Sequence, residues 1–133
     1  MSVSAITTKS VYRYRWKTIG FWALGIALAL LFVGAGVAKL YGTADMVQLF
    51  ATIGIGQWLR YFTGAMEIVI GLTLLYPATV GLGALLGAIT MAFATLANVS
   101  IGHDPIHSTV IAIAFLAIAW ERRSQLVALA DGV

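Results

Sequence analysis

Residues 62–98, FTGAMEIVIGLTLLYPATVGLGALLGAITMAFATLAN, contain two long apolar runs separated by one short break. Pro77 lies in that break, and proline cannot continue the helix that precedes it. Each run approaches the 20 or so apolar residues that a helix needs to cross a bilayer. The tight YPAT link at residues 76–79 therefore predicts an antiparallel hairpin of two membrane helices.

The composition of the whole chain indicates that the bilayer is its solvent. Of 133 residues, 61% are hydrophobic and only 10% are charged, whereas an average soluble domain carries about 25% charged residues. With a mean hydropathy of +0.96, the sequence predicts an integral membrane protein. Cysteine is absent. Its absence excludes thiolate nucleophiles, cysteine-ligated zinc, iron–sulfur clusters and the membrane enzymes that pass electrons from thiols to quinones.

The apolar pattern predicts an all-α fold, an integral membrane four-helix bundle, as one domain over residues 1–133. A short amphipathic surface helix is expected between the first two spans, since Met46, Leu49, Phe50 and Ile53 form one apolar face. A basic and aromatic segment at residues 1–18 precedes the bundle. The four spans are expected at about residues 19–38, 58–76, 78–97 and 106–120.

Basic and aromatic residues predict how the chain sits in the membrane. They gather before the first span and after the last, as in interfacial anchors. Six basic residues there, against Lys39 and Arg60 between the spans, place both termini in the cytoplasm. The basic residues form no stripe that would bind nucleic acid. The anchoring residues are Arg13, Arg15, Trp16, Lys17, Trp120, Arg122 and Arg123.

Glycines in the first and third spans predict close helix contacts. Gly34 and Gly36 are two residues apart, and Gly83 and Gly87 form a Gly-x-x-x-Gly pair. Such small residues allow the backbones of two helices to approach each other. Packing within one chain and packing against a second subunit both fit this pattern.

The HDPIH stretch at residues 103–107 has two interpretations. Asp104 before Pro105 is an ordinary helix start, with a capping side chain followed by proline in the first turn. Alternatively, His103, Asp104 and His107 could bind a metal or carry protons. Three ligands on a single turn are a weak metal motif, and we expect no metal site here.

Glu67 is the most unusual residue of the chain, because it lies in the middle of the second span. A charge at that depth costs at least about 2.5–3.5 kcal/mol, so we expect Glu67 to face the bundle interior. We expect it to be mostly protonated, because a low-dielectric interior disfavours a charged carboxyl unless a cation lies close. Lys39 and Arg60 lie nearer the outer surface and favour interfacial positions, although the side chain of Lys39 can also turn inward and pair with a carboxylate. With His107, these two cations would flank a polar path to Glu67. The four residues are our candidates for ligand or proton binding.

Four stretches resemble the DoxX-like family of small bacterial membrane proteins: LFVGAGVAKLYG (31–42), MVQLFATIGIG (46–56), FTGAMEIVIGLTLLYP (62–77) and GLGALLGAITMAFATLAN (81–98). The resemblance covers roughly residues 17–123 and implies a four-helix bundle in the cytoplasmic membrane. Some relatives are subunits of a thiosulfate:quinone oxidoreductase, and others are associated with redox or stress complexes. By this resemblance, Lys39 and Glu67 are the residues to which a functional role of the family would be transferred.

Two functions follow as expectations. The first is a non-catalytic accessory subunit of a larger respiratory or redox membrane complex. The second is a subunit of a quinone-linked oxidoreductase in which Glu67 handles a proton. Quinone is the one cofactor that the resemblance raises, because the chain contains no obvious cofactor-binding motif. The expected partners are membrane lipids with either other membrane subunits or further copies of this chain. A small transporter is a weaker third alternative, because four short helices without a repeat make alternating access difficult to build.

Overall fold

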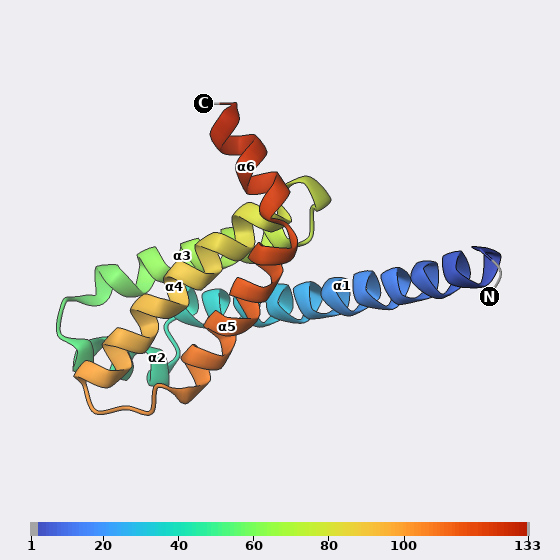
Figure 1. The fold of residues 1–133 in the computed structure, drawn as a ribbon. Coiled ribbons are helices and arrows are strands. Elements are labelled where there is room, and N and C mark those ends of the chain that lie inside the picture. The colour runs from blue at the N-terminus through green and yellow to red at the C-terminus, as the bar shows by residue number, and fades with distance from the viewer. Residues whose placement is uncertain (1–2, 133) are drawn as a thin grey trace.

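The computed structural model describes residues 3–132, with side chains from residue 15 onward, and that part of the chain is helical without a strand. The predicted all-α class is confirmed. Figure 1 shows the arrangement. The elements are α1 (Val3–Tyr41), α2 (Ala44–Ile53), α3 (Gln57–Leu74), the 3₁₀ turn η1 (Pro77–Thr79), α4 (Val80–Ser100), α5 (Ile106–Glu121) and α6 (Arg123–Asp131).

Helix α1 is much longer than the predicted first span. Its 39 residues extend about 58 Å at 1.5 Å per residue, roughly twice the apolar thickness of a bilayer. Its C-terminal part packs on α3, while its N-terminal part projects beyond the bundle (Figure 1). Residues 3–18 thus continue the first span as one helix. The side chain of Arg13 lies outside the described residues.

The bundle is built from neighbouring helices that pack in antiparallel pairs. Helices α3 and α4 form the predicted hairpin around Pro77, and α4 packs along α5. Phe115 of α5 is fully buried and meets the ring of Phe32 from α1 edge to face, with 4.8 Å between the ring centroids. This aromatic pair joins α1 to the α4–α5 half of the core.

Three of the four glycines predicted at helix contacts are confirmed in that role. A Cβ at Gly36 would meet α3, one at Gly83 would meet Thr73, and one at Gly87 would meet the ring of Phe115. All three contacts lie within one chain. The prediction for Gly34 was wrong within the chain, because this glycine is exposed and a Cβ there would meet no atom within 4 Å.

The two ends of the bundle are built differently. At one end lie α2 and the loop at residues 101–105; at the other lie η1, α6 and the free part of α1 (Figure 1). The predicted apolar face of α2 points inward, with Phe50 buried. In the loop, Asp104 accepts a hydrogen bond of 2.8 Å from the amide of Ile106, the first residue of α5. Asp104 therefore binds the first amide of α5, as the capping interpretation predicts, although Pro105 occupies the N-cap position itself.

Helix α6 was not predicted from the sequence. Gln125 attaches it to the α3–α4 hairpin through two hydrogen bonds of 2.9 Å, accepting one from the amide of Gly81 and donating one to the carbonyl of Pro77. The amide of Gly81 lies in the first turn of α4, where helix amides have no partner within their own helix. Gln125 therefore caps α4 and fixes the start of α6.

Helices α1 and α4 are each long and apolar enough to cross a membrane, over Arg15–Tyr41 and, with η1, Pro77–Ser100. Helix α5 is apolar but has only 16 residues. Helix α3 spans 18 residues and carries both Arg60 and Glu67, which lower its hydropathy. Both shorter helices pack against the two long ones.

Candidate functional site

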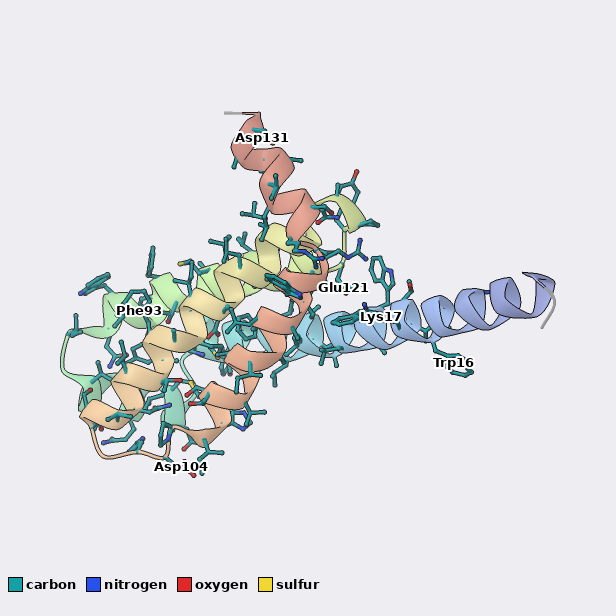
Figure 2. The ribbon with its side chains drawn as sticks, viewed as in Figure 1. Trp16, Lys17, Phe93, Asp104, Glu121 and Asp131 are labelled. Atoms are coloured by element: carbon teal, nitrogen blue, oxygen red, sulfur yellow. The ribbon has the colours of Figure 1, made fainter. Side chains whose placement is uncertain are left out.

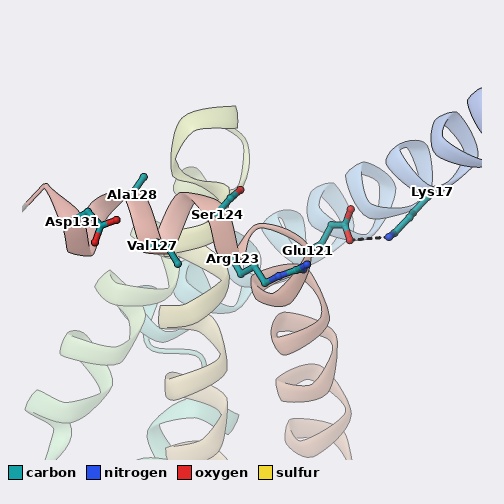
Figure 3. Close-up of a pocket in the computed structure, with 7 residues that line it drawn as sticks. All are labelled: Lys17, Glu121, Arg123, Ser124, Val127, Ala128 and Asp131. Carbon is teal, nitrogen blue, oxygen red and sulfur yellow. Dashed lines mark ion pairs between the residues drawn. The ribbon is translucent and has the colours of Figure 1, made fainter.

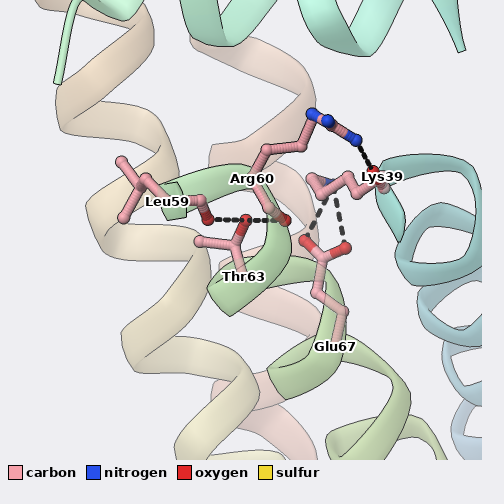
Figure 4. A network of polar contacts seen from close by, with 5 residues as sticks. All are labelled: Lys39, Leu59, Arg60, Thr63 and Glu67. Carbon is pink, nitrogen blue, oxygen red and sulfur yellow. Dashed lines mark hydrogen bonds and ion pairs between the residues drawn. The ribbon is translucent and has the colours of Figure 1, made fainter. Parts of the chain in front are cut away.

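A buried ion pair joins α1 to α3. The Nζ atom of Lys39 donates to both carboxylate oxygens of Glu67, at 2.8 Å to Oε2 and 3.1 Å to Oε1. The side chains are 13% and 5% exposed, respectively. Figure 4 shows the pair between the two helices. A two-oxygen contact in this setting is a strong, charge-assisted interaction, and it satisfies the acid that the sequence places in mid-helix.

The pair forms because each helix carries a glycine one turn before its charged residue. Gly36 precedes Lys39 on α1, and Gly64 precedes Glu67 on α3. A Cβ on Gly64 would lie 3.0 Å from both the carbonyl oxygen of Gly36 and the Cβ of Lys39. The two backbones therefore approach closely enough for the lysine side chain to turn inward and reach the carboxylate.

Arg60 lies at the end of the same interface where α1 ends and α3 begins. This residue is only 5% exposed, and its guanidinium donates to the backbone carbonyl of Lys39 and, at 2.7 Å, to the side-chain oxygen of Gln57. The carbonyl of Lys39 lies in the last turn of α1, where helix carbonyls have no intrahelical donor. A cation at this position also interacts favourably with the helix dipole. Arg60 is therefore a C-terminal cap for α1.

The structure decides between two orientations that the sequence left open for Lys39. Lys39 and Arg60 both turn into the contact between α1 and α3, and Lys39 reaches the carboxylate of Glu67. Glu67 does face the interior, as predicted, with 4% exposure. The expectation that no cation would lie close to Glu67 was wrong, because Nζ of Lys39 lies 2.8 Å from its carboxylate. That Glu67 is mostly protonated stays a prediction.

The structure does not bring His107 into this group. His107 is exposed in the first turn of α5, and none of the hydrogen bonds or ion pairs of the described residues links it to Lys39 or Glu67. His103 and Asp104 are also exposed. Among residues whose side chains are described, no three His, Asp or Glu side chains are grouped to hold a metal ion.

The predicted anchoring residues that the structure describes gather at the opposite end from the loop at residues 101–105. Lys17 of α1 pairs with Glu121 of α5 at 3.2 Å. Trp16 and Trp120 are 71% and 68% exposed. The guanidinium of Arg123 lies 4.6 Å from the ring centroid of Trp120, and that of Arg122 lies 5.6 Å from that of Trp22.

Comparison with known proteins assigns the chain to a family. The family model described as the DoxX-like family matches residues 23–121, which include the whole of the α1–α3 site. The chain belongs to the DoxX-like family. No curated protein and no solved structure matches it. The family match includes Lys39 and Glu67 of this DoxX-like protein but assigns neither of them a role.

Chemically, the site of this DoxX-like protein contains two cations and one carboxylate. The Lys39–Glu67 pair neutralises two of these charges, and the third belongs to the capping guanidinium of Arg60. Thr63 donates to carbonyls of its own helix rather than to the pair (Figure 4). The arrangement can hold α1 and α3 in register.

Proposed function

We propose that this DoxX-like protein is a four-span protein of the bacterial cytoplasmic membrane and a non-catalytic subunit of a larger respiratory or redox assembly. Helices α1, α3, α4 and α5 would span the bilayer, and α2 would lie on the outer surface. The exposed apolar and aromatic side chains along these helices support contact with lipid or with neighbouring subunits.

The observation that carries the non-catalytic role is the closed Lys39–Glu67 pair. Both oxygens of the buried acid accept hydrogen bonds from Lys39, and the neighbouring guanidinium caps α1. These polar groups therefore serve contacts between helices of the same chain. A buried polar pair of this kind fixes the register of two helices, a well-attested use of buried charge.

A quinone-linked role is the second candidate, favoured by one observation. Lys39 places a cation on the carboxylate of Glu67, and the guanidinium of Arg60 binds the backbone carbonyl of the same lysine. A quinone headgroup that accepted a hydrogen bond from Lys39 would release Glu67 to take up a proton. In this alternative the chain is a subunit of a thiosulfate:quinone-type oxidoreductase, and Glu67 is its proton-handling residue.

Purification of the intact protein in mild detergent tests both candidates. We expect stoichiometric membrane partners to co-purify, both with wild type and with the double variant Lys39→Met/Glu67→Leu. The double variant replaces the ion pair by apolar side chains of similar size. Purification without any protein partner would contradict the subunit role. Bound quinone that is present in wild type and lost in the double variant would favour the second candidate.

A further inference from the structure

An open cleft lies where α1 and α6 diverge from the bundle. It has a volume of about 640 Å³, and Figure 3 shows the residues that line it. Lys17 contributes from α1 and Glu121 from the end of α5, while the remaining lining comes from α6. These α6 residues are Arg123, Ser124, Val127, Ala128 and Asp131.

The lining carries both signs of charge in equal number. Lys17 and Glu121 pair with each other at 3.2 Å near the α1 wall. Arg123 donates to the carbonyl of Trp120 at 2.8 Å, which uses one of the five N–H donors of its guanidinium. Asp131 lies at the far end of the cleft from Lys17 (Figure 3). A ligand that carries both charges can therefore be compensated, whereas a purely anionic ligand would also meet two carboxylates.

The cleft combines these charges with an apolar wall at an interfacial position. Trp16 and Trp120 expose their rings, and each is the chain neighbour of a member of the Lys17–Glu121 pair. Tryptophan is enriched at the depth of lipid headgroups. Val127 and Ala128 provide the apolar part of the lining, and Val127 is 58% exposed. The cleft thus offers polar groups and an apolar surface side by side, as a headgroup with its glycerol backbone requires.

We propose that this cleft binds the headgroup of a zwitterionic aminophospholipid. Arg123 and the hydroxyl of Ser124 contact its phosphate, and Asp131 accepts hydrogen bonds from its primary ammonium group. The rest of the lipid, beyond its headgroup, packs against Val127 and extends toward the apolar surface of the proposed spans. This inference rests on the proposed membrane placement.

Native mass spectrometry of the detergent-solubilised protein tests the site with three added lipids: phosphatidylethanolamine, phosphatidylcholine and phosphatidylglycerol. We expect phosphatidylethanolamine to be retained best, because its ammonium can donate to Asp131 and the trimethylated group of phosphatidylcholine cannot. Arg123→Gln should weaken its retention by at least about tenfold, the effect of one charge-assisted hydrogen bond. Asp131→Asn should reduce the preference over phosphatidylcholine.

Arg122→Gln is the matched control, because it removes the same charge from the neighbouring residue, which lies against Trp22 outside the cleft. Retention should not change in this variant. Equal retention of the three lipids, stronger retention of phosphatidylglycerol, or equal losses in the two arginine variants would overturn the proposed site. Carbonate extraction of membranes that contain the protein tests the proposed membrane placement separately. Release of the protein into the supernatant would contradict the membrane assignment itself.

Discussion

Removing either member of the Lys39–Glu67 pair leaves a buried charge without its counter-charge. Breaking a buried pair in this way typically costs about 3–5 kcal/mol, whereas replacing both members by apolar residues is often neutral. We therefore expect Lys39→Met and Glu67→Leu each to lower the free energy of unfolding markedly. The double variant should recover most of the loss. Thermal unfolding of the four proteins in one detergent gives the coupling energy.

The same double variant separates a structural pair from a proton site. If the pair only joins α1 to α3, the double variant should unfold like wild type and retain its partners. If the stability lost in the double variant equals the sum of the losses in the two single variants, the two side chains do not interact directly. A stable double variant that loses a quinone-linked activity would instead assign chemistry to the Lys39–Glu67 pair.

The sequence predicted the unusual character of Glu67 but left its pairing with Lys39 open. The cost of a charge in an apolar run is a local property, so it could be read from residues 64–72 alone. The partner lies 28 residues away on another helix. The inward turn of Lys39 depends on how closely α1 and α3 approach each other. Gly36 and Gly64 indicate a close approach only when it is already known that these two helices pack together.

At the scale of helix contacts, two glycines of α1 form a matched test. A Cβ at Gly36 would lie 2.6 Å from the carbonyl oxygen of Gly64, while one at Gly34 would meet nothing within 4 Å. Gly36→Ala should therefore destabilise the protein by about 1–3 kcal/mol through overpacking. Gly34→Ala should be neutral or stabilise it by up to about 1 kcal/mol, as alanine does in a helix. Thermal unfolding in detergent measures both effects. Destabilisation by Gly34→Ala would indicate that Gly34 packs against another subunit.

The small-residue face of α4 gives a second test at this scale. Gly87 faces the ring of Phe115 in the core, so Gly87→Leu should destabilise the bundle by about 1–3 kcal/mol or more. Ala92→Leu adds a comparable side chain on the exposed side of the same helix and serves as the control. If the two variants unfold at the same temperature, α4 does not pack through Gly87.

Element positions were predicted well where the apolar pattern was long, and less well at the ends of the chain. The spans at 58–76, 78–97 and 106–120 differ from α3, α4 and α5 by at most three residues at either end. Helix α6 was missed because it is short, with nine residues of mixed polarity. It is held by the contacts of Gln125 with the distant α3–α4 hairpin, which no local pattern reveals.

For the molecule as a whole, the two ends of the bundle differ in charge and shape. The end with α6 and the free part of α1 carries Lys17, Arg122 and Arg123, while the other end carries α2 and the exposed loop with His103 and Asp104 (Figure 2). The prediction that Lys17 and the residues after the last span share one side agrees with the 3.2 Å contact between Lys17 and Glu121. Which side of the membrane each end faces remains a prediction from the basic residues.

Single-cysteine labelling tests that orientation directly, because the chain contains no cysteine of its own. His103→Cys places a thiol in the exposed loop between α4 and α5, and Ser124→Cys places one near the start of α6. If both termini are cytoplasmic, a membrane-impermeant maleimide should label position 103 in intact spheroplasts. Position 124 should then be labelled only after the membrane is ruptured. The two sites serve as controls for each other, since both are exposed and lie at opposite ends of the bundle. The reverse pattern would contradict the orientation but keep the four spans, whereas labelling of both sites in intact spheroplasts would contradict a bundle that spans the membrane between them.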